Sequence, residues 1–162
     1  MMRILVDADA CPVKEQIYKV AARYSLPVIV VANSPMRIPD QQDVSFMHIP
    51  GGLDAVDDWI AEETTADDIV TTADIPLAGR VVDRGAVCID FRGNEFTADS
   101  LGGMLASREI AQYLRGYGAY GGGPPPLTPR DRGKFAGKLD EVVNRQIRIA
   151  RRTPRPETPP DM

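Results

Sequence analysis

Short apolar runs alternate along the first ninety residues with segments in which apolar positions recur every three or four residues. The apolar runs cover residues 3–7, 27–32, 44–49, 68–72 and 86–90. Runs of this length are typical of buried strands, whereas the longer periodic segments are typical of helices with one apolar face. Strands that alternate with helices predict an α/β fold, a three-layer sandwich with a mostly parallel central sheet.

The predicted helices of this region begin at recognisable signals. Pro12 suits the first position of a helix, where the missing N–H costs nothing. The break at residues 50–52, Pro-Gly-Gly, precedes a second helix that carries Trp59 on its apolar stripe. Asp74 is suited to cap a third helix, which has Pro76 near its start.

The last third of the chain predicts two C-terminal helices. Residues 100–115 form the first, and the Gly/Pro-rich segment 117–127 is a loop with a flexible and a stiff part. The second begins at Thr128, which is suited to cap it, and continues with an apolar face. Residues 151–162 contain too few apolar side chains to pack and are expected to be disordered, which leaves one domain over residues 1–150.

A tight turn is predicted directly after the fifth apolar run. Residues 92–94, Arg-Gly-Asn, are a turn signal, and they allow residues 95–97 to fold back as a small hairpin. Asp90 ends the strand before this turn.

Composition narrows the class of protein. The 162 residues are 43% hydrophobic and 26% charged, which excludes wholesale disorder, and no apolar run approaches the length of a membrane span. The acidic residues close to the start disfavour a signal peptide. Cys11 and Cys88 are too few for a disulfide framework and lack partners at metal-ligand spacing, so we expect a cytoplasmic protein without membrane contact and with both thiols reduced.

The net charge of −4 conceals an asymmetry between two parts of the chain. Residues 1–99 carry −9 and residues 100–162 carry +5. The basic residues expected to contact a substrate surround the Gly/Pro-rich loop and are Arg108, Arg115, Arg130, Arg132 and Lys134. Guanidinium groups bind phosphates, and the neighbouring Tyr117 and Tyr120 suit stacking on unpaired bases, so single-stranded nucleic acid is the expected partner. The alternative is that any one of these residues is an ordinary solvent-facing helix charge, which explains the combination of basic and aromatic side chains less easily.

Carboxylates follow two of the predicted strands. Asp7 and Asp9 come directly after the first strand, and Asp74 follows the fourth. Ligands of parallel sheets bind at the carboxyl ends of strands, and oxygen ligands there suit Mg²⁺ or Mn²⁺. Asp9 and Asp74 could instead only cap helices.

A further acid is expected from the helix that follows the third strand. Asp57 and Asp58 both lie near its start, where acidic residues also stabilise the helix dipole. The pair at residues 67–68 precedes its strand and therefore belongs to the opposite edge of the sheet.

Three further polar side chains have two interpretations each. Thr72, at the end of the fourth strand, could bind a phosphate or a metal-bound water, or reflect only the preference of threonine for strands. Cys11 is either structural or adjacent to a metal. His48, the only imidazole, is either a general base or a structural hydrogen-bonding group.

Four separated motifs occur in order along the chain. They are Asp7 to Lys14 (DADACPVK), Asp57 to Ile60 (DDWI), Asp68 to Ala78 (DIVTTADIPLA), and Gly122 to Pro124 (GGP) with Asp131 to Phe135 (DRGKF). With these motifs the chain resembles the bacterial YaiI/YqxD family over roughly residues 3–140. The resemblance implies a fold similar to PIN-type nuclease domains, in which acids from several strand ends and one helix hold a divalent metal.

Carried onto this sequence, the resemblance makes Asp7 the first metal-binding acid and Asp74 the acid after the fourth strand. Asp58, or alternatively Asp57, matches the helix acid. The fourth acid has no clear counterpart, because Asp90 lies in no recognisable motif, and Asp9 is a candidate to replace it. The expected catalytic and metal-binding set is Asp7, Asp9, Asp58 and Asp74.

The function expected from the residues and the resemblance together is a nuclease that depends on Mg²⁺ or Mn²⁺ and cleaves RNA. One alternative is a nucleic-acid-binding or regulatory module without turnover. A further alternative is a phosphatase of the haloacid dehalogenase type with Asp7 as nucleophile, although Cys11 stands where that type usually has Thr or Val.

Overall fold

A computed structural model describes residues 2–52, 54–103 and 126–152. Its centre is a five-stranded sheet in the order β3-β2-β1-β4-β5. All the paired strands are parallel. The strands are β1 (Ile4–Asp7), β2 (Val28–Ala32), β3 (Val44–His48), β4 (Ile69–Thr71) and β5 (Val87–Ile89). The predicted α/β fold with a parallel central sheet is confirmed.

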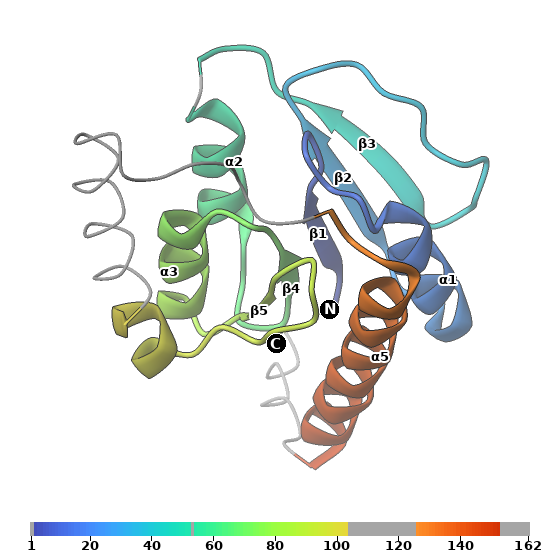
Figure 1. Ribbon diagram of the computed structural model, residues 1–162, viewed down its shortest axis with the longest axis vertical. Coiled ribbons are helices and arrows are strands. Elements are labelled where there is room, and N and C mark those ends of the chain that lie inside the picture. The colour runs from blue at the N-terminus through green and yellow to red at the C-terminus, as the bar shows by residue number, and fades with distance from the viewer. Residues whose placement is uncertain (1, 53, 104–125, 153–162) are drawn as a thin grey trace, which may run out of the picture.

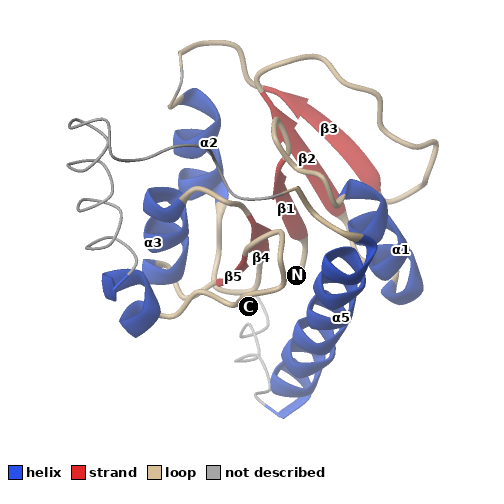
Figure 2. Cartoon of the chain, in the orientation of Figure 1, coloured by secondary structure: helices blue, strands red, loops and turns tan. Residues whose placement is uncertain are grey.

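Helices cover both faces of the sheet, as Figures 1 and 2 show. One face packs against α1 (Lys14–Tyr24) and α5 (Pro129–Arg152), and the other against α2 (Ala55–Glu63) and α3 (Ile75–Asp83). Successive side chains of β1 divide between the two cores, since Ile4 and Val6 belong to the first and Leu5 to the second. Both faces of the strand are therefore apolar, as expected for a parallel strand between helices.

The helix boundaries differ from the predicted ones by a few residues. Helix α1 begins at Lys14, and Pro12 lies in the turn before it, because the fully buried Val13 keeps a non-helical backbone at the cap position. The predicted caps of α3 and α5 are confirmed: Asp74 accepts from the Leu77 amide, and Thr128 and Asp131 bond reciprocally.

The C-terminal third is described in part. Residues 98–103 are helical, in agreement with the start of the helix predicted over 100–115. Helix α5 continues through Arg152, so Arg151 and Arg152, which the sequence placed in a disordered tail, are helical. Residues 104–125, with Arg108, Arg115 and most of the predicted loop 117–127, lie outside the described residues, as do residues 153–162. Within the described ranges, no helix is both long and apolar enough to cross a membrane.

The predicted turn after β5 joins the sheet to α5. Glu95 folds back to form an antiparallel bridge with Ile89, and its carboxylate pairs with Lys138 and Arg145 of α5. Gly93, inside the turn, has a φ of +84°. A Cβ atom there would lie 3.1 Å from the Lys134 carbonyl oxygen.

Replacing Gly93 by alanine should destabilise the protein by about 2 kcal/mol or more, because a positive φ alone costs about 1 kcal/mol and the α5 backbone must also move. Gly85→Ala is the matched control, since Gly85 has a similar φ of +85° but its added Cβ would lie at an ordinary 3.4 Å from Ala66. Denaturant unfolding measures both variants. Equal losses of stability would mean that the contact with α5 does not constrain this turn.

Candidate acidic site

The candidate site lies where the connections of two neighbouring strands diverge. β1 and β4 are adjacent and parallel, but the chain leaves β1 toward α1 on one face and leaves β4 toward α3 on the other. Such a divergence opens a crevice at the carboxyl ends of the strands, which is where α/β sheets bind ligands. Asp7 ends β1, and Asp74 follows β4 after three residues, so both acids reach this crevice.

Thr72 links these two acids. Its hydroxyl donates to Asp7 Oδ2 at 2.7 Å and accepts from the Asp74 amide at 3.0 Å. Thr72 is fully buried, so a direct contact with substrate, as its sequence position suggested, does not fit the structure. Thr72 instead holds Asp7 and Asp74 at a set separation.

The helix acid in this crevice is Asp57. A pocket of about 650 Å³ is lined by Asp7, Asp9, Asp57 and Asp74 together. Asp58, the residue preferred from the sequence, lies outside this lining and pairs with Arg80 at 2.7 Å. Of the two helix acids, Asp57 and not Asp58 therefore lines the pocket, because one step along a helix turns the side chain by about 100°.

Asp9, which also lines the pocket, has hydrogen bonds to both of its carboxylate oxygens. Its two carboxylate oxygens accept from the backbone amides of Asn33 at 2.8 Å and Ser34 at 3.2 Å. The Asn33 side chain in turn donates to the carbonyl oxygens of Ile49 and Gly51. Asp9 thus joins the loop after β1 to the loop after β2, and Asn33 joins the loop after β2 to the loop after β3. Only the spatial proximity of these loops reveals this role.

Three carboxylates retain oxygens that are free within the described part of the chain. Asp7 Oδ1 and Asp74 Oδ2 make no hydrogen bond there, and neither oxygen of Asp57 does. Burial, together with the smaller effects of the negative charges of Asp74 and Asp7, raises the pKa of Asp57 to about 6. Burial also raises the pKa of Asp7, against the hydrogen bond from Thr72, which lowers it. These acids are partly desolvated and repel one another.

The carboxylates of this pocket are chemically of the kind that binds a hard divalent cation. Carboxylate oxygens are the preferred ligands of Mg²⁺ and Mn²⁺, and a cation would replace the mutual repulsion of the acids by attraction. In the ranges that the structure describes, no three His, Cys, Asp or Glu side chains are placed closely enough to hold one ion. The acids thus share a pocket without forming a closed coordination sphere.

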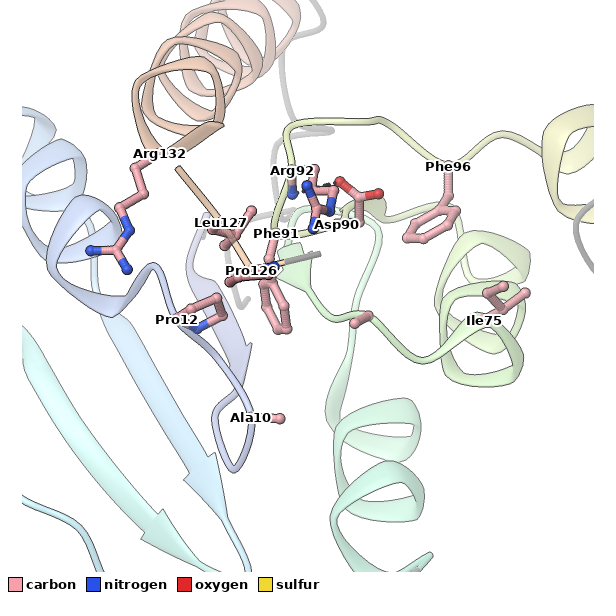
Figure 3. A pocket seen from close by; sticks show the side chains of 11 residues that line it. Ala10, Pro12, Ile75, Asp90, Phe91, Arg92, Phe96, Pro126, Leu127 and Arg132 are labelled. Carbon is pink, nitrogen blue, oxygen red and sulfur yellow. Dashed lines mark hydrogen bonds between the residues drawn. The ribbon is translucent and has the colours of Figure 1, made fainter. Parts of the chain in front are cut away.

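The basic side chains predicted to bind substrate are partly described. Arg130, Arg132 and Lys134 are exposed on the first turns of α5. Arg132 lines an apolar pocket beside the acidic one, close to Pro12 in Figure 3. Arg130 and Lys134 line neither pocket.

Asp90, the alternative fourth acid, does not reach the acidic pocket. Its carboxylate accepts from the backbone amides of Arg92 and Asn94 and from the Asn94 side chain, and it lines the apolar pocket in Figure 3. Asp90 therefore stabilises the turn after β5.

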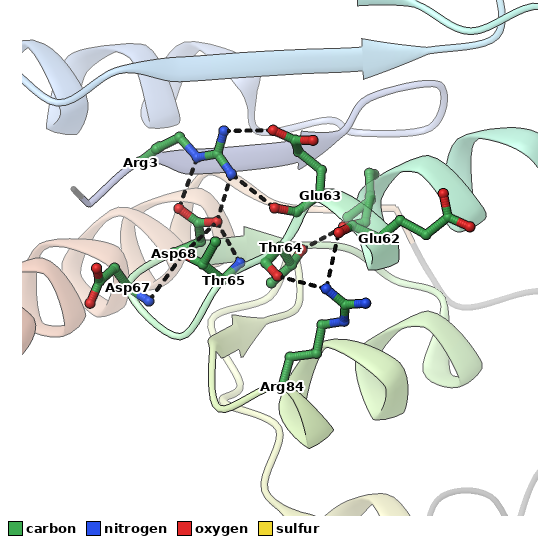
Figure 4. A network of polar contacts seen from close by, with 9 residues as sticks. Arg3, Glu62, Glu63, Thr64, Thr65, Asp67, Asp68 and Arg84 are labelled. Atoms are coloured by element: carbon green, nitrogen blue, oxygen red, sulfur yellow. Dashed lines mark hydrogen bonds and ion pairs between the residues drawn. The ribbon is translucent and has the colours of Figure 1, made fainter.

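The acids at residues 67–68 lie at the opposite edge of the sheet, as predicted. Asp68 is fully buried and pairs with Arg3 through two hydrogen bonds of 2.9 Å. Arg3 also contacts Glu63, as Figure 4 shows. This network joins the amino ends of β1 and β4 and has no contact with the candidate site.

The cysteines and the histidine lie outside the acidic lining. Both thiols are buried, and burial raises the pKa of Cys11 to about 11, so Cys11 is no nucleophile at neutral pH. His48 bonds through Nε2 to the Asn33 carbonyl oxygen at 2.8 Å and stacks on Phe46. The burial of Cys11 and the contacts of His48 favour a structural role for each of these two residues.

Comparison with known proteins identifies relatives along nearly the whole chain. A UPF0178 protein of Rhodopseudomonas palustris strain HaA2 is 48% identical, covering 98% of this chain and 94% of the relative. Another, of a Bradyrhizobium species, is 50% identical over 88% of this chain and 87% of its own length. No solved structure matches. A family model described as "Uncharacterized BCR, YaiI/YqxD family" matches residues 5–145, and the chain therefore belongs to the YaiI/YqxD family.

Proposed function

We propose that the acidic pocket binds Mg²⁺ or Mn²⁺ and that the protein is a cytoplasmic nuclease, which hydrolyses phosphodiester bonds of single-stranded RNA. The observation that supports this function best is the common pocket of Asp7, Asp57 and Asp74, which reach it from a strand end, a helix and a strand-to-helix loop. Carboxylates that face one another at a strand-end crevice favour binding of a cation.

In this proposal the residues of the pocket and of α5 have different roles. Asp7, Asp57 and Asp74 face the cation, which would keep water among its ligands because no three acids of the described ranges close around one ion. Thr72 positions Asp7 through its 2.7 Å hydrogen bond, and Asp9 holds the loop that borders the pocket. When bound, a divalent cation lowers the pKa of a water molecule and stabilises negative charge on a phosphate oxygen. Arg132 and its basic neighbours on α5 attract the RNA backbone.

A cleavage assay with a defined cation content tests the proposal. Protein freed of metal with EDTA is mixed with an end-labelled single-stranded RNA, and we expect product only after Mg²⁺ or Mn²⁺ is added. Asp7→Asn, purified in the same way, is the control for contaminating nucleases and should form no product. Cleavage in EDTA, or equal cleavage by Asp7→Asn, would contradict the proposal.

The second candidate function is an RNA-binding module without turnover. The placement of the acids favours it, because in the described ranges no three of them are close enough to hold one ion. This function predicts RNA binding in EDTA that weakens steeply with salt, and no product with either cation. The phosphatase alternative is less well supported, because both oxygens of Asp9, its second acid, are bonded to backbone amides.

A further inference from the structure

An apolar pocket lies beside the acidic one and has no part in the proposed coordination of a cation. It has a volume of about 520 Å³, within the range of sites that bind small molecules. Figure 3 shows Phe91 between two groups of apolar side chains. Pro12, Pro126 and Leu127 lie on one side, and Ile75 and Phe96 lie on the other.

The two pockets meet along two short segments of the chain. Asp9 lines the acidic pocket and the next residue, Ala10, lines the apolar one. Likewise Asp74 lines the acidic pocket and the preceding residue, Ala73, lines the apolar one. The two pockets therefore adjoin along these two segments.

The polar side chains of the apolar pocket differ in whether they are free to bind a ligand. The Asp90 carboxylate is occupied by the turn after β5, and Arg92 pairs with Asp131 at 3.5 Å. Arg132 is exposed and makes no side-chain hydrogen bond or ion pair with the residues that the structure describes. The pocket thus offers apolar walls and one guanidinium group that can bind an anion.

We propose that this pocket binds one nucleotide unit, with the base against the apolar walls and a phosphate on Arg132. A nucleotide combines a flat, largely apolar base with a phosphate, which matches these two features. Its place in catalysis rests on the proposed function: a base held here brings an adjoining phosphodiester toward Asp7, Asp57 and Asp74. The pocket then selects unpaired nucleotides, since a paired base cannot enter it.

Binding of AMP to the metal-free protein tests the pocket independently of cleavage. Saturation-transfer NMR or calorimetry in EDTA should detect AMP, and Ala10→Leu should weaken its binding about tenfold or more by filling the pocket. Ala10 is exposed and has no positive φ, so the larger side chain leaves the fold intact. Failure of AMP to bind, or equal binding by Ala10→Leu, would overturn the proposal.

The role of Arg132 is tested by comparing AMP with adenosine. Arg132→Ala should weaken AMP about tenfold, the value of one hydrogen bond between charged groups, and leave adenosine unchanged. Arg148→Ala removes the same charge from an exposed position further along the same helix and lies outside the pocket lining, so it should leave AMP binding intact. Equal losses in the two variants would show a general charge effect and contradict the assignment.

Two outcomes separate this inference from the proposed function. If AMP binds as described and no RNA is cleaved, the pocket stands and the nuclease proposal fails. If RNA is cleaved and Ala10→Leu affects neither AMP binding nor cleavage, the pocket proposal fails alone. If an unpaired RNA displaces AMP, the pocket binds a nucleotide of an RNA chain. If it does not displace AMP, the pocket binds a free mononucleotide.

Discussion

Asp57→Asn should reduce metal-dependent cleavage of RNA by about 100-fold or more. Loss of residues that merely orient metal ligands already costs 10- to 100-fold, so loss of a ligand costs at least as much. Among the residues that the structure describes, neither oxygen of Asp57 has a hydrogen-bond partner, and Asp57 shares its pocket with Asp7 and Asp74. The measurement is the initial rate of RNA cleavage at saturating Mn²⁺.

Asp58→Asn is the matched control, because it makes the same chemical change one residue along the same helix. Asp58 is exposed and pairs with Arg80 at 2.7 Å on the surface, so its loss should change the cleavage rate less than twofold and stability by under about 1 kcal/mol. Equal effects of the two variants would show that Asp57 has no special role.

Asp57→Asn should also change the stability of the protein in EDTA. Burial and the neighbouring acids disfavour the charged form of Asp57, whose pKa lies near 6, so this carboxylate destabilises the metal-free folded state at neutral pH. Asp57→Asn should therefore stabilise the protein in EDTA by about 1 kcal/mol, after allowance for solvent around a partly exposed group. Added Mn²⁺ should raise the melting temperature of the wild type more than that of the variant.

The largest expected loss of stability follows from Asp68→Asn. Asp68 is fully buried and accepts from Arg3 Nε, Arg3 Nη2 and the Thr65 amide at 2.8 to 2.9 Å. An amide can replace only some of these acceptors, and it leaves Arg3 with the more exposed Glu63 as its remaining charged partner. We therefore expect a loss of about 3 kcal/mol, at the low end for a broken buried pair. Urea unfolding at neutral pH measures it.

Asp67→Asn provides the control for this variant, because Asp67 is the exposed neighbour of Asp68. It should cost under about 1 kcal/mol. Asp68→Asn should also keep its cleavage rate at temperatures where it remains folded, because Asp68 lies at the edge of the sheet opposite the candidate site. A loss of cleavage in a folded Asp68→Asn protein would contradict the separation of the two edges.

The candidate site was predictable from the sequence in outline. Asp7 and Asp74 each follow an apolar run, and parallel strands deliver such residues to one edge. The choice between Asp57 and Asp58 was open, although a signal existed: four residues on, Asp57 is followed by the buried Ala61 and Asp58 by the exposed Glu62. Residues four apart share a helix face, so Asp57 lies nearer the core.

The apolar pocket could not have been predicted in the same way. Phe91 and Phe96 belong to the two different cores, and Leu127 precedes α5, some thirty residues further along the chain. Their meeting depends on the turn after β5 docking on α5, where Glu95 pairs with Lys138 and Arg145. Long-range contacts of this kind leave no periodic pattern in a sequence.

The sequence by itself determined the strands, the helices, their parallel arrangement and the edge at which Asp7 and Asp74 meet. These follow from hydrophobic periodicity and strand direction, which are local properties. The tertiary structure decided which acids share a pocket, that Thr72 is buried between two of them, and that Asp9 is bonded to the loop after β2. Those outcomes depend on the rotation of α2 and on the meeting of distant loops, which only the packing of the two cores sets.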